Sequence, residues 1–246
     1  MSSIIVKGVS VEFELRTKNG LGLKAKSEPF YALKHIDLQI RDGDRVALLG
    51  HNGAGKTTLL KVLSGILPPS KGQVEVDGEL RPALTLSLGL MAGASCLENI
   101  KLSGMYHGLK GSELENYIDN VCTRADLDRF LFQPVKTLSK GMRSRLVISM
   151  ALVAKSEILI FDEWIGAVDR HQLEGESTLA DAIKAADIFI VASHKLVLIQ
   201  KYCNRCLILK NGRIIHDLDA KEGVDLYKKM RPTTVGITDL GDEYND

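Results

Sequence analysis

The sequence lacks any long hydrophobic run and any excess of one charge. Its longest apolar stretches, Leu146–Ala154 and Ile158–Phe161, are far shorter than the about 20 residues that a membrane-spanning helix needs. The 32 basic residues nearly balance the 31 acidic ones, which gives no electrostatic argument for a nucleic-acid partner. The first residues, Met1-Ser2-Ser3-Ile4, lack the features of a secretory signal. We therefore expect a cytoplasmic protein with no membrane span and no nucleic-acid partner.

Cysteine is scarce as well, with four residues among 246, too few for a disulfide framework in a chain of this length. Cys203 and Cys206 form a C-x-x-C pair, which in other settings is a redox or metal-binding motif. Neither a second pair nor a nearby histidine cluster accompanies it, and the apolar stretch Leu207–Leu209 follows at once. This context favours core packing of the two thiols, with a redox or metal role as the alternative.

Strand and helix patterns alternate along the chain, which predicts an α/β fold with a mostly parallel sheet flanked by helices. We expect an N-terminal antiparallel β part, an inserted helical subdomain at about 90–140, and a type I′ hairpin at Asn211-Gly212. We expect residues 16–28 to form an exposed loop and Ser112 to cap a helix. One domain should span residues 1–225, followed by a short tail at 226–246. The expected strands are Ile4–Leu15, Tyr31–Ile40, Arg45–Leu49, a strand-turn-strand over Gln73–Leu80, Ile158–Phe161, Ile188–Ala192, Leu207–Lys210 and Arg213–His216, and the expected helices are Lys56–Ile66, Leu97–Tyr106, Glu113–Thr123, Gly141–Val153, Gln172–Ala185 and one from about Ala220 to Met230.

A glycine-rich loop stands between a predicted buried strand and a predicted helix. Residues 50–57 complete the pattern G-x-x-x-x-G-K-[ST], whose glycines allow backbone N–H groups to point at phosphate oxygens. Lys56 adds a point charge for the β- and γ-phosphates, and the hydroxyl of Thr57 is a ligand for Mg²⁺. This loop predicts a nucleoside triphosphate site. Its residues are Gly50, His51, Asn52, Gly53, Ala54, Gly55, Lys56, Thr57 and Thr58.

Two further buried strands end in polar residues at the same predicted sheet edge. Ile158–Phe161 is followed by Asp162 and Glu163, and Ile188–Ala192 is followed closely by His194. Ligands of α/β sheets gather at the carboxyl ends of strands. We therefore expect Asp162 to hold Mg²⁺ and Glu163 to polarise the water that attacks the γ-phosphate. His194 is expected to contact the γ-phosphate or that water.

A second anion-binding turn precedes the apolar helix at 141–153. Ser139 offers a hydroxyl and Gly141 a free helix N-terminus. One monomer already cradles the phosphates in its glycine loop, so this turn is redundant there. It becomes useful if it covers the γ-phosphate that a second copy of the chain holds.

These motifs, in this order, resemble the nucleotide-binding subunits of ABC transporters across residues 4–225. The glycine loop is similar to Walker A, Ile158–Glu163 to Walker B with its catalytic glutamate, and Leu138–Met142 to the signature motif. Gly166–Asp169 lies at the D-loop spacing, and His194 at the switch histidine. The resemblance implies ATP and Mg²⁺ as cofactors, ATP hydrolysis by a homodimer, and an integral membrane permease as partner. It also implies a peripheral location on the cytoplasmic face of the plasma membrane.

A narrower resemblance is to exporters of capsular polysaccharide, O-antigen and teichoic acid. It rests on Ser139–Leu146, Leu97–Ile100, Gly104–Gly108 and the long insertion before Tyr31. It implies export of a cell-surface polysaccharide. Alternatives are another cargo such as a lipid, metal or peptide, a soluble ABC-type ATPase acting on ribosomes or DNA, and a metabolic P-loop kinase.

The sequence departs from the family pattern at several places. Residues 82–97 contain no glutamine, so the Q-loop glutamine is missing, and Lys140 replaces the first glycine of the signature. Trp164 stands where smaller residues are commoner. Either Phe13 or Tyr31 is expected to stack on adenine, and the narrower resemblance favours Tyr31.

Overall fold

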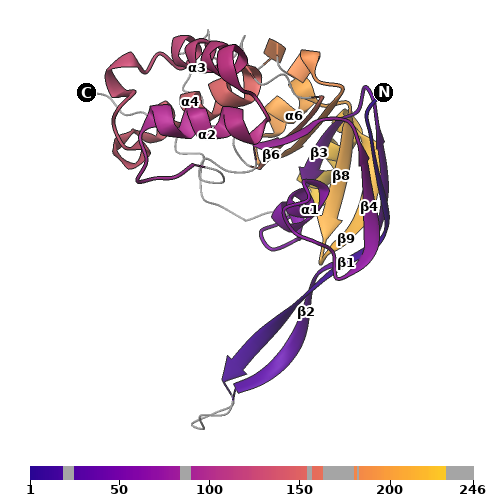
Figure 1. The fold of residues 1–246 in the computed structure, drawn as a ribbon. Coiled ribbons are helices and arrows are strands. Elements are labelled where there is room, and N and C mark those ends of the chain that lie inside the picture. Colours follow the sequence, from indigo (N-terminus) through magenta and orange to yellow (C-terminus); the bar gives the residue numbers. More distant parts are fainter. Residues whose placement is uncertain (19–24, 84–89, 154–156, 163–179, 182, 231–246) are drawn as a thin grey trace, which may run out of the picture.

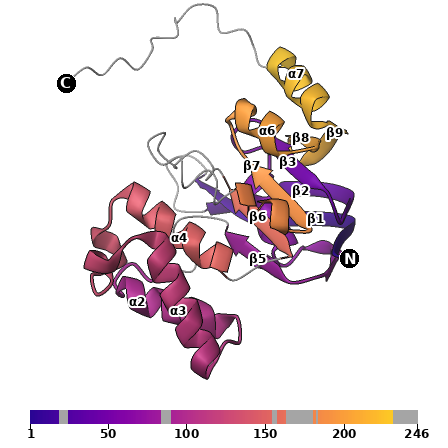
Figure 2. The same cartoon turned by 90° about the horizontal axis from the view of Figure 1, so that it is seen from above.

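The computed structural model describes residues 1–18, 25–83, 90–153, 157–162, 180, 181 and 183–230. Two β-sheets meet at a common core, and a group of helices adjoins one end of the larger sheet (Figures 1 and 2). No helix of this part of the chain is long and apolar enough to cross a membrane. The helices are α1 (Lys56–Leu63), α2 (Cys96–Tyr106), α3 (Gly111–Ala125), α4 (Lys140–Val153), α6 (Leu196–Tyr202) and α7 (Ala220–Met230), with short 3-10 turns η1 (Asp128–Phe130) and η2 (Val135–Thr137).

The larger sheet has six strands in the order β5-β6-β7-β3-β8-β9. All neighbours are parallel except β8 and β9, which confirms the mostly parallel sheet. The β8–β9 turn has positive φ at both Asn211 (50°) and Gly212 (77°), so the predicted type I′ hairpin is also correct. The strands are β3 (Arg45–Leu49), β5 (Leu80–Ala83), β6 (Ile158–Asp162), β7 (Ile188–Ala192), β8 (Arg205–Lys210) and β9 (Arg213–Asp219).

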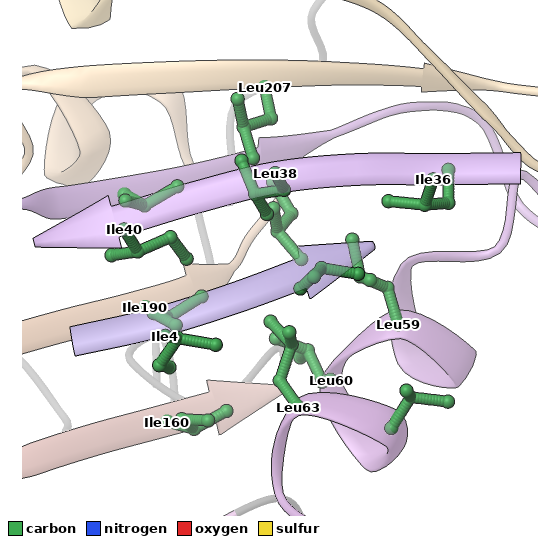
Figure 3. Close-up of a cluster of buried hydrophobic side chains, with 14 of the residues drawn as sticks. Ile4, Ile36, Leu38, Ile40, Leu59, Leu60, Leu63, Ile160, Ile190 and Leu207 are labelled. Atoms are coloured by element: carbon green, nitrogen blue, oxygen red, sulfur yellow. The ribbon is translucent and has the colours of Figure 1, made fainter. Parts of the chain in front are cut away.

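The smaller sheet is antiparallel, in the order β2-β1-β4, and forms the predicted N-terminal β part. Its strands are β1 (Ser3–Lys18), β2 (Ala25–Arg41) and β4 (Lys71–Asp77). Figure 3 shows the core between the two sheets, where Ile4, Leu38 and Ile40 of the small sheet face Ile160 and Ile190 of the large one. Three leucines of α1 (Leu59, Leu60 and Leu63) close this core. Burial of this apolar surface holds the first residues of α1 at a fixed place beside the sheet.

The exposed loop expected at residues 16–28 is wrong at 16–18 and 25–28, which are strand, and residues 19–24 lie outside the described part. β1 continues to Lys18 and β2 starts at Ala25, with Arg16 opposite Ser27 in an antiparallel ladder. β4 pairs with β1 only as far as Ser10, so the outer part of the hairpin is a two-stranded ribbon that projects from the body (Figure 1). Among the described residues no third strand pairs with this part of the hairpin, so an alternating apolar pattern is not required there. The sequence accordingly shows none.

The helices α2, α3 and α4 form the predicted helical part, and their core also includes Phe161 of β6 and Phe189 of β7. Ile100 of α2, Tyr117 and Val121 of α3 and Leu146 of α4 are almost fully buried together. The expected cap by Ser112 is wrong, because α3 begins at Gly111, two residues before the expected start at Glu113, and its N-cap, Lys110, makes no side-chain cap bond. A capping box instead starts α2, where Ser95 and Glu98 bond reciprocally.

On the face of the large sheet away from the small sheet, α6 and α7 cover β3 and β8. Ala47 and Leu49 of β3 pack there with Ile199 of α6 and with Val224 and Tyr227 of α7. The helix expected at Gln172–Ala185 is helical at 180, 181 and 183–185, and its earlier residues lie outside the described part.

The C-x-x-C pair lies in this same layer. Burial raises the pKa of Cys203 and of Cys206 to about 12, so both thiols stay protonated at neutral pH. The side chain of Cys206 is 0% exposed, and a Cβ on Gly223 of α7 would come within 2.7 Å of its Sγ. Such close packing against α7 supports the prediction of a core role.

Candidate nucleotide-binding site

The glycine loop connects β3, which ends at Leu49, to α1, which starts at Lys56. Two of its glycines are required by close backbone neighbours. A Cβ on Gly50 would lie 2.5 Å from the carbonyl oxygen of Leu209, and a Cβ on Gly55 would lie 2.7 Å from that of Ala32. The loop is therefore held between β8 and β2, with the N-terminus of α1 behind it, where backbone N–H groups favour an anion.

Lys56 is the one lysine among the described residues that is buried, at 7% exposure. Its Nζ donates to the carbonyl oxygens of Gly50 (2.7 Å) and His51 (3.1 Å). The ammonium group is thus folded over the loop, where its positive charge adjoins the loop backbone. Around it, Ala54 is buried and Thr58 half-buried, whereas His51, Asn52, Gly53 and Thr57 are exposed.

Strand register brings three of the predicted groups to one sheet edge. Asp162 of β6 lies opposite Ala192 of β7, which lies opposite Leu48 of β3. Gly50 follows two residues after Leu48, and His194 two residues after Ala192. Asp162, His194 and the glycine loop therefore adjoin at the carboxyl edge of the sheet. Glu163, Trp164 and the D-loop positions Gly166–Asp169 lie outside the described residues.

The signature turn stands elsewhere in the chain. Ser139 caps α4, since its Oγ accepts the N–H of Met142 at 3.2 Å, and Gly141 lies in the first turn of that helix. Figure 1 shows α4 among the helices α2 and α3, and α1 apart from it beside the sheet. The signature turn thus belongs to the helical part, whereas the glycine loop belongs to the sheet and α1.

The two candidate aromatic residues both lie on the β1–β2 hairpin, on neighbouring register positions. Tyr31 stands opposite Glu12, and Phe13 stands opposite Phe30. Both are exposed, Tyr31 by 36% and Phe13 by 42%. Tyr31 directly precedes Ala32, whose carbonyl oxygen abuts Gly55. Tyr31 is therefore next in the chain to the residue that adjoins the glycine loop, and Phe13 lies one register position farther along the hairpin.

Sequence reasoning missed the role of Gly212. Its N–H donates to the carbonyl oxygen of Ala54 in the glycine loop at 3.0 Å, and its own carbonyl accepts the N–H of Lys34 at 2.7 Å. The β8–β9 turn therefore joins the glycine loop to β2. The Asn-Gly pair predicted the turn, but no local signal indicates which distant backbone the turn contacts.

The sequence profile of the ABC transporter family matches residues 33–166, more than half of the chain and the span from β2 past Asp162. The chain belongs to the ABC transporter family. It is therefore an ATPase, and ATP is its nucleotide. This confirms the resemblance that the motif order indicated.

Similar proteins agree with this assignment. The chain is 32% identical to the teichoic acids export ATP-binding protein TagH of Listeria innocua over 92% of this chain and 70% of that protein. It is 37% identical to the O-antigen export system ATP-binding protein RfbE of Yersinia enterocolitica, over 76% and 78%. Among solved structures, a dimeric ATP-binding cassette in a post-hydrolysis state with ADP and phosphate is 21% identical, with a TM-score of 0.71 over 88% of this chain and 98% of that one. That likeness confirms the ABC ATPase fold.

Proposed function

We propose that this chain is the ATP-hydrolysing subunit of a transporter that exports a cell-surface polysaccharide. The observation that carries the proposal is the similarity, over most of the chain, to proteins named for export of teichoic acids and of O-antigen. A single ABC ATPase domain spans residues 1–225 with the helical subdomain inserted, and the tail at 226–246 begins within α7.

The active unit in this proposal is a dimer that closes around two ATP molecules. Lys56 and the glycine loop of one copy hold the triphosphate, and Ser139 and Gly141 of the second copy cover the γ-phosphate. The separation of α4 from α1 within one chain supports this arrangement, because the capped N-terminus of α4 has no phosphate to meet there. Tyr31 stacks on adenine from the side of the hairpin.

The residues at the sheet edge fit a magnesium ion and a hydrolytic water. The Thr57 hydroxyl and the Asp162 carboxylate are the hard oxygen donors that Mg²⁺ prefers, and when bound the ion neutralises charge on the phosphates. Lys56 supplies a fixed positive charge beside the γ-phosphate. Glu163 accepts a proton from the attacking water, and His194 orients that water at the γ-phosphate.

A separate integral membrane permease carries the glycan in this proposal. The proteins that support this proposal are named as the ATP-binding members of export systems, which favours a separate partner for the translocation path. The chain then works on the cytoplasmic face of the plasma membrane, with no nucleic acid involved. Glycan selectivity belongs to the permease.

The substitution Glu163→Gln tests the catalytic assignment. Loss of a general base should lower ATP hydrolysis by at least about 100-fold, while ATP binding and ATP-dependent dimerisation persist. Glu75→Gln, at an exposed carboxylate on β4 that pairs with Lys7 at 2.9 Å, is the matched control and should retain full turnover. Retained hydrolysis in Glu163→Gln would refute the assigned base.

The assignment of a polysaccharide as the cargo is tested by a second experiment. The chain is purified together with a candidate membrane permease and reconstituted into vesicles. A lipid-linked polysaccharide should stimulate ATP hydrolysis, whereas the same lipid without its glycan should not. Stimulation by a peptide or a metal ion in place of the glycan would refute export of polysaccharide.

A further inference from the structure

One buried amide group organises the loop that leads into α2. Asn99 is 2% exposed, and its Oδ1 accepts the N–H of Met91 at 2.7 Å. Its Nδ2 lies within hydrogen-bond distance of the carbonyl oxygens of Met91 (3.1 Å), Ala94 (3.3 Å) and Ser95 (2.8 Å). A single side chain therefore holds both ends of the loop at residues 91–95.

The same loop is bonded to the segment that precedes the signature turn. The N–H of Val135 donates to the carbonyl of Ala94 at 3.0 Å, and the N–H of Lys136 donates to that of Ala92 at 2.9 Å. The 3-10 turn η2 continues this segment to Leu138, which is 3% exposed. Ser139 follows directly. We call the loop 91–95 together with the segment 133–138 the brace.

The loop of the brace lies within residues 82–97, which lack the glutamine that the family usually carries. The hydrogen bonds of the brace hold the segment that leads into the signature turn. Asn99 occupies a buried position on α2, where an apolar side chain would ordinarily be more favourable. A buried amide is tolerated when its hydrogen bonds are satisfied. The bonds of Asn99 all go to backbone atoms of the brace.

We propose that Asn99 is a positioning residue for ATP hydrolysis: through the brace it sets the place of Ser139 against the γ-phosphate held by the second copy. This inference rests on the proposed closed dimer. Without Asn99 the N–H of Met91 loses its side-chain acceptor and the carbonyls of Ala94 and Ser95 lose a side-chain donor, so the loop loosens. The bonds of Ala92 and Ala94 to Lys136 and Val135 loosen with it, and Ser139 loses its fixed position.

Hydrogen exchange tests the brace without any activity measurement. In Asn99→Ala the amides of Val135 and Lys136 should exchange at least about 10-fold faster, which corresponds to the loss of one hydrogen bond's stabilisation. Tyr117→Phe is the matched control. It removes the buried hydroxyl that bonds Met150 (3.2 Å) and Ser103 (3.0 Å) in the same helical part, yet leaves the brace unchanged. Unchanged exchange at both amides in Asn99→Ala would overturn the proposal.

Dimerisation tests the role of Ser139. In a Glu163→Gln background, sedimentation with ATP should show that Asn99→Ala weakens the dimer by about 10-fold, whereas the ATP affinity of the monomer changes by less than about two-fold. Tyr117→Phe should change neither quantity. A merely structural role for Asn99 would lower stability but leave the affinity of the folded copies intact, and that result would overturn the proposal.

If Asn99→Ala does not fold, Asn99→Asp keeps the acceptor for the N–H of Met91 and loses the donors, and the same two readouts apply to it. If the Glu163→Gln parent itself fails to dimerise with ATP, the proposed closed dimer is refuted, and the role of Asn99 in closure with it. A parent that dimerises normally beside an unaffected Asn99 variant refutes the role of Asn99 alone.

Discussion

The N–H of Gly212 donates to the carbonyl oxygen of Ala54 at 3.0 Å, so the β8–β9 turn supports the glycine loop from outside. The turn also accepts a hydrogen bond from Lys34 of β2. Three segments that are distant in the sequence therefore meet at one glycine. The position of the phosphate-binding loop depends on this junction as well as on its own residues.

Gly212→Ala should disturb the junction. Gly212 has φ of 77°, and an added Cβ would lie 2.8 Å from the carbonyl oxygen of Ala32. We expect the free energy of unfolding to fall by about 2–3 kcal/mol, from left-handed strain plus the displacement of β2. ATP affinity, measured by calorimetry, should fall as well.

Gly43→Ala is the matched control for backbone strain. Gly43 has φ of 86°, but a Cβ there meets nothing within 4 Å. This variant should lose about 1–2 kcal/mol of stability, as left-handed strain alone predicts, and bind ATP normally. Equal ATP affinity in the two variants would show that Gly212 does not support the loop.

Tyr31→Ala should weaken ATP binding more than Phe13→Ala. Tyr31 adjoins the point where β2 abuts Gly55, whereas Phe13 faces Phe30 farther along the hairpin. Loss of stacking should cost about 10-fold in affinity at Tyr31 and less than two-fold at Phe13. Titration with ATP measures both. A larger loss at Phe13 would assign adenine to the other aromatic residue.

Local chemistry made much of this molecule predictable. The glycine loop, the Asn211-Gly212 turn and the buried strands ending at Asp162 and Ala192 each carry their own residue pattern, so the sequence indicated both the parallel sheet and the candidate edge. The motif order then indicated the family, which the family profile confirms.

What the sequence did not indicate depends on neighbours. The outer hairpin, where Arg16 lies opposite Ser27, pairs beyond the last residue of β1 that β4 reaches, and no hydrophobic period marks it in the sequence. The bonds of Gly212 to Ala54 and of Val135 to Ala94 link segments whose proximity only the folded chain defines. Such contacts leave no short-range pattern.

Thiol reactivity should separate core packing from redox chemistry at the C-x-x-C pair. With a pKa of about 12, Cys203 and Cys206 carry about 1000-fold less thiolate at pH 7.5 than an ordinary cysteine, so Ellman's reagent should label them very slowly in the native protein. All four cysteines should react at once after unfolding in guanidinium. Rapid labelling of the native pair, or a reversible Cys203–Cys206 disulfide, would contradict the core role.

The capping box of α2 should make the helical part sensitive to acid. Bonds from the N–H and the hydroxyl of Ser95 to the Glu98 carboxylate lower the pKa of Glu98 below its ordinary value. A carboxyl group whose pKa is lowered in the folded state stabilises the fold above its unfolded pKa, and this stabilisation disappears as pH falls through the folded pKa. Urea unfolding should therefore show Glu98→Gln less stable than the parent at pH 7, with a difference that shrinks towards pH 3.

Glu113→Gln controls for the general effect of an acidic residue near a helix N-terminus. Glu113 lies in the first turn of α3, and among the described residues it forms no cap bond. It should show a smaller difference at pH 7, because the helix dipole acts on both residues but the paired Ser95 bonds act on Glu98 only. If the two variants lose equal stability at pH 7, or if the Glu98→Gln difference persists unchanged at pH 3, the capping box does not stabilise the start of α2.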